Sequence, residues 1–585
     1  MVKSIKLIQY ILIMFLICLG ASAKTIHVPG DSATIQAGIN GANGGDTVLV
    51  ADGVYKGEGN RDIDFGGRKI VLMSENGYDF THIDCEGSEQ EPHRGFIFHT
   101  AEDSSTVVDG FWIRNGYAIS GGGMLIYNSM PIIKNCRITD SQAISTSVFD
   151  GGGAIYVTTD IHIDSCIFEN NYSNQLGGAI ISEGQGNPTV KNCIFRNNSA
   201  RSAGGAYYCG SRLMGSSDSL MNCIFVDNYA DNRAGAIYLA LGCSAYTYNC
   251  RFVRNSAKWY GGAIHSRIND SRIIGCVFDS NWTNSGGAIY ITQCPNVLEE
   301  CVFYNNYAEA GGGAICGTSM HGTIIRNCIF LRNRAIGCGG AIMNYMYRWE
   351  SDMTIDNSTF FGNDASTGSA LYQRSSYSSI IMNNCIVAFN SSGYPIISEK
   401  YTTTIGLVRP SCTDIYGNDS GDWVDHIASY AGINGNMSID PLFCDTSNND
   451  LHLADNSPCA PGHPDNSCGT LIGALGVGCG ATDVTDNEND NRPESFALHQ
   501  NYPNPFNPST KIEYTLPRRS NVTITIFDVL GRKVKTIFDQ TMPAGTHTAY
   551  WNGTDSDNNL VATGVYFYQI KAGDFVNTKK MLLLK

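Results

Sequence analysis

The stretch Gly286–Ile315 reads GGAIYITQCPNVLEECVFYNNYAEAGGGAI, and it begins and ends on the same four letters. Its second Cys, Cys301, is followed by Phe two residues later and by Asn five residues later. This pattern recurs along the chain at intervals of 25 to 30 residues. The repeated residue is Cys, or Ser in one copy, at Cys136, Cys166, Cys193, Cys223, Cys250, Cys276, Cys301, Cys328, Ser358 and Cys385. A repeat of this length indicates a stack of similar units rather than one globular domain.

Two further positions carry the same residue in most copies. Two places after the Cys is Phe, in Phe168, Phe195, Phe225, Phe252, Phe278, Phe303, Phe330 and Phe360. Five places after it is Asn, in Asn171, Asn198, Asn228, Asn255, Asn281, Asn306, Asn333, Asn363 and Asn390. Turns of Gly and Asn, with little helical periodicity, predict a coil of three short parallel strands stacked on the next coil. Equivalent residues then lie about 4.8 Å apart, with Cys and Phe inside and Asn at the bends.

The composition and the N-terminus bear on partners and compartment. The chain of 585 residues has a net charge of -15, so it lacks the basic surface that nucleic-acid binding requires. Residues 1–23 carry Lys3 and Lys6, then an apolar run, and end in Ala21-Ser22-Ala23, which is the pattern of a cleaved signal peptide. An uncleaved anchor is the alternative. We therefore expect an exported protein with no transmembrane helix in the mature chain.

The motifs carry a family resemblance. The GGAI and FxxN signatures, such as FRNN at Phe195–Asn198 and FYNN at Phe303–Asn306, resemble the repeats of the polymorphic outer-membrane adhesin family. More broadly, residues 24–480, with regular repeats over about 121–392, resemble the right-handed parallel β-helices of the pectin-lyase-like superfamily. The stretch Thr34–Gly59 resembles the start of such solenoids, where a short helix covers the first coil. The resemblance implies an all-β fold that hosts lyases, hydrolases and adhesins alike.

The composition changes after Gly480. Residues 481–493 read ATDVTDNENDNRP, which predicts a flexible acidic linker. Within residues 494–585, NYPNPFNPST (Asn501–Thr510) and GVYFYQIKAGDFVNTKKMLLLK (Gly564–Lys585) resemble the type IX secretion C-terminal sorting domain. Its alternating strands fit a small immunoglobulin-like β-sandwich. The resemblance implies that type IX secretion machinery releases or anchors the protein at the outer-membrane surface of a Gram-negative bacterium.

A column of aromatic residues is the first candidate site. It directly follows the GGAI-type motif and consists of Tyr156, Tyr208, Tyr238, His265, Tyr290 and Tyr372. If the preceding Ile residues point inward, strand alternation turns these rings outward, where they could stack on sugar faces. Stacked rings also stabilise a parallel sheet without any ligand, so a purely structural column is the alternative.

Acidic residues near the first coils are the second candidate. A polysaccharide lyase would need clustered carboxylates for Ca²⁺ and a nearby base, and Asp62, Asp64 and Asp84 are candidate metal ligands. Nothing in the sequence brings the three together, so no catalytic residue is assigned, and Ca²⁺ is expected only if the protein is a lyase. Charges two places before the repeat Cys alternate in sign, as in Glu299 and Arg326, which favours a structural ladder of ion pairs.

The 21 cysteines fall into two groups. Those of the repeat are expected to be free thiols, because coils about 4.8 Å apart exceed the Cβ separation of about 3.8 Å that a disulfide prefers. In an exported protein, disulfides are expected instead in the terminal group outside the repeat. That group consists of Cys412, Cys444, Cys459, Cys468 and Cys479.

These observations favour a secreted or cell-surface protein that acts as an adhesin or binds a carbohydrate. An extracellular polysaccharide lyase or glycoside hydrolase is the alternative, and a purely structural surface protein is the third hypothesis. Carboxylates clustered with a basic partner in one groove would favour the enzyme. An open aromatic face would favour binding.

Overall fold

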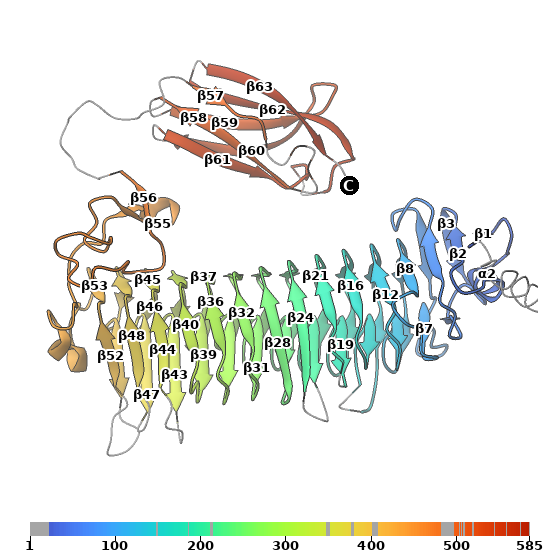
Figure 1. Ribbon diagram of the computed structural model, residues 1–585, viewed down its shortest axis with the longest axis horizontal. Coiled ribbons are helices and arrows are strands. Elements are labelled where there is room, and N and C mark those ends of the chain that lie inside the picture. The colour runs from blue at the N-terminus through green and yellow to red at the C-terminus, as the bar shows by residue number, and fades with distance from the viewer. Residues whose placement is uncertain are drawn as a thin grey trace, which may run out of the picture. The chain divides into compact units, whose positions relative to one another are not determined.

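The computed structural model describes residues 23–480 and 496–583, apart from short internal segments. Those segments are 148–149, 185, 211–214, 347–351, 376–378, 400–406, 502–503, 505, 507–508, 518–519, 543–544, 557–558 and 574. The expected linker, and all but the last residue of the expected signal peptide, lie outside the described residues. The chain divides into two compact units, Met1–Thr482 and Asp483–Lys585, which Figure 1 shows as a parallel β-helix and a smaller β-sandwich.

A single coil shows the plan of the β-helix. It runs through β24 (Ser216–Met221), β25 (Ile224–Val226), β26 (Tyr229–Ala230) and β27 (Ile237–Leu239), and the next coil begins with β28 (Cys243–Tyr248). Each strand pairs in parallel with its equivalent on the next coil, which builds four long sheets. We name these sheets A, B, D and C in the order in which one coil visits them. Three strands per coil were predicted, and the fourth is the two-residue strand of sheet D.

The four sheets run along the stack of coils (Figure 1). Sheet A has 15 strands, from β1 (Thr25–Val28) to β52 (Val408–Ser411), and sheet B has 14, from β3 (Gly53–Lys56) to β53 (Asp414–Tyr416). Sheet C has 13 strands, from β4 (Ile63–Asp64) to β51 (Ile396–Glu399), and sheet D has 11, from β10 (Tyr117–Ala118) to β50 (Ser391–Ser392). The predicted parallel β-helix is therefore confirmed.

The repeated Phe residues form one continuous stack inside the β-helix. All eight are fully buried, and they form seven neighbouring pairs with ring centroids 4.6–4.9 Å apart and interplanar angles of 2–9°. These distances measure the coil-to-coil spacing in this protein. Face-to-face stacking is imposed by the parallel register, which places each ring directly over its equivalent on the previous coil.

The repeated Asn residues form a buried hydrogen-bond ladder at the bend between sheets B and D. The Asn281 amide donates to the carbonyl of Phe252 (3.0 Å) and to the side-chain oxygen of Asn306 (2.9 Å). The oxygen of Asn281 accepts the backbone N–H of Asn255 at 3.0 Å. An amide carries donors and an acceptor, so each copy satisfies the polar groups of its neighbours.

The repeated Cys residues line the corner between sheets A and B. The backbone N–H of Cys250 points at the sulfur of Cys276, 3.4 Å away, and Ser358 takes the same role for the N–H of Cys328 at 3.2 Å. The nine repeat cysteines are all free, which confirms the prediction. Burial raises the pKa of the Cys385 thiol, so it stays protonated and unreactive at neutral pH.

Three disulfides lie outside this ladder. They are Cys209–Cys243, Cys412–Cys468 and Cys444–Cys479. The last two belong to the terminal group where we expected disulfides, and Cys459 of that group is free and buried. The first was not predicted.

Different elements cover the two ends of the β-helix core. The helix α2 (Ile35–Asn40) buries Ile35 and Ile39 over the first coil, and the hydroxyl of Thr34 accepts the N–H of Ala37 at 3.2 Å, as the resemblance implied. At the other end the 3₁₀ helix η1 (Asp425–Tyr430) buries Ile427. Within the described residues, no helix has the length and apolar character needed to cross a bilayer.

The coils end at β53, before the Gly480 boundary expected for the β-helix. Residues 434–480, which we call the flap, lack the repeat and lie along the outside of the last coils. The flap contains β54 (Phe443–Asp445), η2 (Thr446–Asn448), β55 (Asp450–Ala454) and β56 (Val477–Cys479). Its Leu451 packs with Leu331 and Phe361, two outward residues of sheet B.

The second unit is the predicted immunoglobulin-like sandwich. One sheet contains β57 (Ala497–Leu498), β58 (Thr510–Leu516) and β61 (Gly545–Trp551), and the other contains β60 (Lys533–Met542), β59 (Ser520–Phe527), β62 (Gly564–Ala572) and β63 (Phe575–Leu583). All pairs are antiparallel. Its core contains Tyr514, Trp551 and Tyr568.

The Asn ladder predicts a large difference between two similar substitutions on one coil. Asn281→Ala should lower the free energy of unfolding by about 2–4 kcal/mol, because it leaves buried polar groups on Phe252 and Asn255 without partners. Asn284→Ala, three residues later, removes a 3.4 Å contact with Glu309 and a 3.1 Å bond from the Ser285 hydroxyl, and it should cost less than about 1 kcal/mol because neither bond is fully buried. Urea unfolding of both variants measures the difference, and equal losses would contradict this role for the ladder.

Candidate ligand-binding groove

The predicted aromatic column lies on sheet C. The register pairs Tyr208 with Tyr238, Tyr238 with His265, and His265 with Tyr290. The Ile residues that precede Tyr238, His265 and Tyr290 belong to the interior core, so the predicted alternation is confirmed. The Tyr208 and Tyr238 rings are stacked at 5.5 Å, and the His265 ring makes edge contacts with Tyr238 at 5.0 Å and Tyr290 at 5.1 Å.

The column is not an open platform, and the hypothesis of a sugar-stacking surface is corrected on this point. Four members are buried, with exposed fractions of 3–8%: Tyr238, His265, Tyr290 and Tyr372. Tyr156 and Tyr208 are half-buried. The chain that leads into each GGAI motif folds over the column and packs Leu176, Ala203 and Ala234 against it. The rings therefore serve the packing of the β-helix.

Several polar groups of the column are hydrogen-bonded within the protein, although the buried Nδ1 of His265 has no partner among the described residues. Burial, together with Arg233 and Arg267, lowers the pKa of His265 to about 3, so the imidazole is neutral. Its Nε2 lies 3.0 Å from the hydroxyl of Thr292. The Tyr372 hydroxyl donates to Glu399 at 2.6 Å. These bonds agree with the structural alternative.

The three acidic candidates near the first coils have separate partners. Each pairs with a basic side chain: Asp62 with His93 (2.6 Å), Asp64 with His99 (3.1 Å) and Asp84 with Arg114 (3.2 Å). In the described part of the chain, the three carboxylates do not form a group close enough to share a metal ion. The structure therefore does not support a metal site at these residues.

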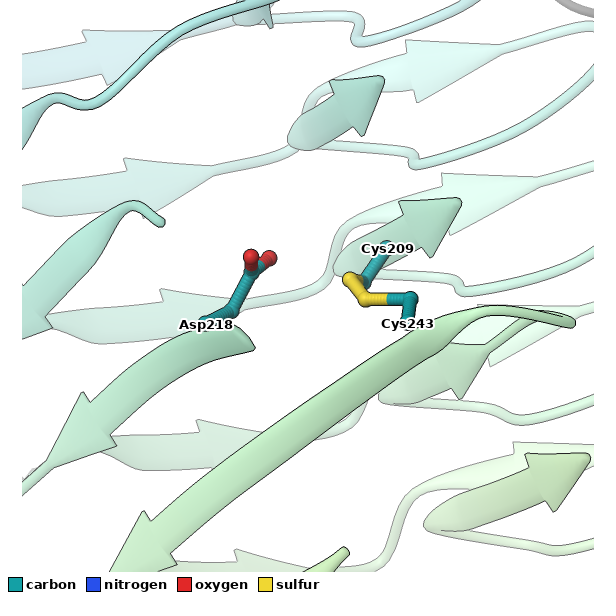
Figure 2. A group of neighbouring side chains, drawn as sticks. All are labelled: Cys209, Asp218 and Cys243. Carbon is teal, nitrogen blue, oxygen red and sulfur yellow. A yellow bond between two sulfur atoms is a disulfide. The ribbon is translucent and has the colours of Figure 1, made fainter. Parts of the chain in front are cut away.

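One buried cluster was not anticipated. Figure 2 shows the disulfide between Cys209 and Cys243 with Asp218 beside it, and the three potential ligand atoms lie within 4.8 Å of one another. The Asp218 carboxylate accepts the hydroxyls of Tyr207 (2.6 Å) and Ser216 (2.8 Å). Since both sulfurs are in the disulfide, they are not thiolate ligands. The cluster is a cross-linked polar corner of the interior.

An open groove follows the edge where sheet A turns into sheet B over the last five coils. Its volume is about 670 Å³, and it is lined by Glu299, Arg326, Asn327, Asp356, Asn357, Asn383, Asn384, Ser411 and Cys412. The lining residues of sheet A end β36 (Val297–Glu299), β40 (Ile324–Arg326), β44 (Met353–Asp356), β48 (Ile380–Asn383) and β52. Five stacked coils give the groove a length of about 19 Å.

Hydrogen bonds hold the charged side chains of the groove in place. The Arg326 guanidinium binds Glu299 on the previous coil through two contacts of 2.8 and 2.9 Å. Asp356 accepts the amide of Asn383 on the next coil at 2.8 Å. The predicted charge ladder is thus present at Glu299 and Arg326, and Lys134 pairs in the same way with an Asp one coil earlier at 3.1 Å. Fixed donors and acceptors of this kind suit a ligand rich in hydroxyl groups.

The flap borders the groove on the side of sheet B. The Asn357 amide donates to the carbonyl of Leu471 at 2.9 Å, and the Thr470 hydroxyl donates to Asn384 at 3.1 Å. The disulfide from Cys412 to Cys468 joins the floor of the groove to the flap. These contacts hold the flap beside the groove.

Sequence reasoning found the charges of the groove but not the groove itself. The charge ladder that the sequence predicts includes Glu299 and Arg326, whereas the alternation of charges gives no indication of the amides of Asn357 and Asn384. The available signal was the run of Asn residues just before the repeat Cys, as in MNNC at residues 382–385. The bordering flap lies about a hundred residues further along the chain, and no repeat connects it to these coils.

Comparisons with known proteins agree with the architecture. The family model for the right-handed β-helix region matches residues 70–257 and 247–407, which together make up more than half of the chain. The chain belongs to the right-handed β-helix family. A model for the FlgD Ig-like domain matches residues 507–574, within the second unit. No curated protein matches the chain. The β-helix fold is consistent with a surface or carbohydrate-related protein.

The buried Asp218 predicts a pH-dependent contribution to stability. Burial raises the pKa of Asp218 from 3.8 to about 6, so the folded state holds a proton that the unfolded state releases. Its contribution is present in full below about pH 4 and is lost as the pH rises through about 6, with a total of about 3 kcal/mol. Compared with Asp218→Asn, the natural chain should therefore lose about that much stability between pH 4 and 7. Urea unfolding of both proteins across this pH range tests the prediction. A stability difference between the natural chain and Asp218→Asn that does not change with pH would contradict it.

Proposed function

We propose that this chain is a secreted or cell-surface protein that binds an extracellular polysaccharide in the groove, as an adhesin or carbohydrate-recognition protein. The observation that carries the proposal is the lining of the groove. Two carboxylates, one guanidinium, four amides and a hydroxyl face a space about 19 Å long. Sugars are recognised through many hydroxyl groups, each of which donates and accepts hydrogen bonds.

The charge of the groove limits the kinds of polysaccharide that it is expected to bind. Arg326 neutralises Glu299 through a two-contact ion pair, while Asp356 is bound by the neutral amide of Asn383. The lining is therefore weakly acidic, which favours a neutral polysaccharide over a strongly anionic one. Side-chain amides and paired charges fixed on rigid strands cost little entropy when a ligand binds.

A matched pair of double substitutions tests the groove. Asp356→Ala with Asn383→Ala removes both partners of one hydrogen bond, so neither is left unsatisfied in the protein. Binding to the polysaccharide that the natural chain prefers in a panel should weaken by about tenfold or more. Asp109→Ala with Lys134→Ala removes a similar pair, together with an exposed bond from Asn135, on the fourth and fifth strands of sheet A, away from the groove, and should bind normally. Equal affinities for the two variants would contradict a groove site.

A polysaccharide lyase or hydrolase is the second candidate. It is favoured by one observation, the placement of Glu299 and Asp356 on either side of Arg326 over three coils. Paired carboxylates and a cation can perform general acid and base catalysis on a glycan. Both carboxylates are held by side-chain partners, so the groove does not offer free ligands for Ca²⁺, and we assign none. Shortening of polysaccharide chains in the same panel, lost in Glu299→Gln with binding retained, would favour the enzyme.

The proposed destination follows from the two ends of the sequence. The apolar N-terminal segment supports export, and the C-terminal unit, with its Ig-like match, supports the resemblance to a type IX sorting domain. We infer an outer-membrane surface or extracellular location in a Gram-negative bacterium, with the type IX secretion machinery as partner. A structural surface rod would fold and be exported in the same way, yet would bind no polysaccharide.

Deletion of the C-terminal unit tests the export route. A chain that lacks residues 494–585 should fold, because the core of the β-helix is separate from that of the sandwich. In the native host it should accumulate in the periplasm rather than at the surface. Cell fractionation and protease accessibility of intact cells measure the outcome. Normal surface display of the truncated chain would contradict the sorting role.

A further inference from the structure

On the first seven strands of sheet D, the outward residues form a row in which rings and polar side chains alternate. The eighth strand adds Tyr307, and the next two carry the charged Arg334 and Asp364. The register places the first eight of these residues one above another in the order Tyr117, Gln142, Tyr172, Ser199, Tyr229, Ser256, Trp282 and Tyr307. Their strands include β14 (Gln142–Ala143), β18 (Tyr172–Ser173), β22 (Ser199–Ala200), β30 (Ser256–Ala257), β34 (Trp282–Ser285) and β38 (Tyr307–Gly311). We call this row the aromatic row. Its first four rings occupy every second coil.

The alternation separates these rings from the ladders that stabilise the fold. The Phe stack sets a spacing of 4.6–4.9 Å per coil in this protein. Rings two coils apart therefore lie about 9.6 Å from each other, which exceeds the roughly 4.5–7 Å over which aromatic rings interact. Tyr172, Tyr229 and Trp282 cannot stack on one another across the intervening serines. Trp282 and Tyr307 lie on adjacent coils. Mutual ring packing, however, does not explain Tyr172 and Tyr229, whose neighbours in the row are Gln or Ser.

The aromatic row is uncharged, and its rings differ in exposure, with Tyr117, Tyr172 and Tyr307 half-buried. Tyr229 and Trp282 are 40% and 39% exposed. None of the eight members carries a charge. Two acidic side chains lie near Tyr229: Asp227 is paired with Arg254 through contacts of 2.7 and 2.8 Å, and burial together with Asp231 raises the pKa of the Tyr229 hydroxyl. A row of rings and hydroxyls without charges of its own suits an uncharged ligand that offers apolar faces and hydroxyl edges.

We propose that the aromatic row binds an extended, uncharged β-1,4-linked polysaccharide of the glucan or chitin type, lying parallel to the stack of coils. In such a chain, successive sugars are turned over, so every second sugar presents the same face in the same direction. The length of this two-sugar repeat is close to the length of two coils. Tyr172, Tyr229 and Trp282 therefore each meet an equivalent sugar face, while Ser199 and Ser256 lie opposite the sugars between them. This surface lies on sheet D, and its ligand is held independently of the groove on sheets A and B.

The spacing of the rings can be tested without changing their number. Tyr229→Ser with Ser256→Tyr exchanges two residues, keeps the composition, and breaks the two-coil interval. Tyr229→Ser with Trp282→Ser removes two rings and places in the row a residue that it already uses on other coils. Both variants should bind microcrystalline cellulose or β-chitin about tenfold or more weakly than the natural chain in a depletion assay. Tyr127→Ser with Tyr394→Ser removes two rings that are 51% and 46% exposed elsewhere, and this control should bind normally.

The remaining measurements distinguish binding at the aromatic row from binding in the groove. Thermal unfolding measured by circular dichroism should be similar for all four proteins, and affinities are compared for folded protein only. Normal binding by the exchange variant, or no binding of the natural chain to either solid, would overturn the proposal. The groove variant Asp356→Ala with Asn383→Ala should still bind the solids. If this variant binds the solids but no longer binds the soluble polysaccharide, the two sites are separate. If it binds neither ligand, the aromatic row is not an independent site.

Discussion

Parallel hydrogen bonding between successive coils is the constraint on which this structure depends. It fixes the coil spacing at 4.6–4.9 Å, as the Phe stack shows, and it brings every repeated residue directly over its equivalent. Each residue type must therefore be compatible with a copy of itself. Phe achieves this by ring stacking and Asn by an amide that both donates and accepts. A residue with a single buried charge could not be repeated in this way, because like charges would meet on every coil.

The same constraint explains why the charged residues lie where they do. On the outer face of sheet A, solvent permits charges, and opposite signs on adjacent coils convert repulsion into ion pairs such as Arg326 with Glu299. Near the last coils this column becomes the lining of the groove because the flap lies beside it and the disulfide from Cys412 to Cys468 fixes that position. The same positions of the repeat thus form a structural ladder on most coils and the lining of the groove on the last coils. What distinguishes the last coils is the flap that lies beside them.

Much of the fold could be predicted from the sequence because the interactions that define it recur. Ten copies of one pattern identified the interior Phe, Cys and Asn residues, and the structure places them there. The candidate site was harder to predict because it depends on contacts that occur once in the chain and are not repeated on every coil. Burial of Tyr238 and Tyr290 depends on how the turn before GGAI folds over sheet C, and the groove depends on contacts from Thr470 and Leu471. Strand alternation gives the direction of a side chain, but not what covers it.

The aromatic residues of this protein show how a repeat can separate packing from recognition. A ring on every coil is within stacking distance of its neighbours, so Phe278 and Phe303 satisfy each other inside the core. Four rings of sheet C, at Tyr208, Tyr238, His265 and Tyr290, are also in contact, and all but the first are buried. A ring on every second coil has no partner at stacking distance among its own copies, and its exposed face is left for a ligand whose repeat matches two coils. Tyr229, with Ser199 and Ser256 on the two adjacent coils, belongs to this last class. Periodicity within a repeat protein therefore carries information on its ligand as well as on its fold, since a repeating surface is complementary to a repeating polymer.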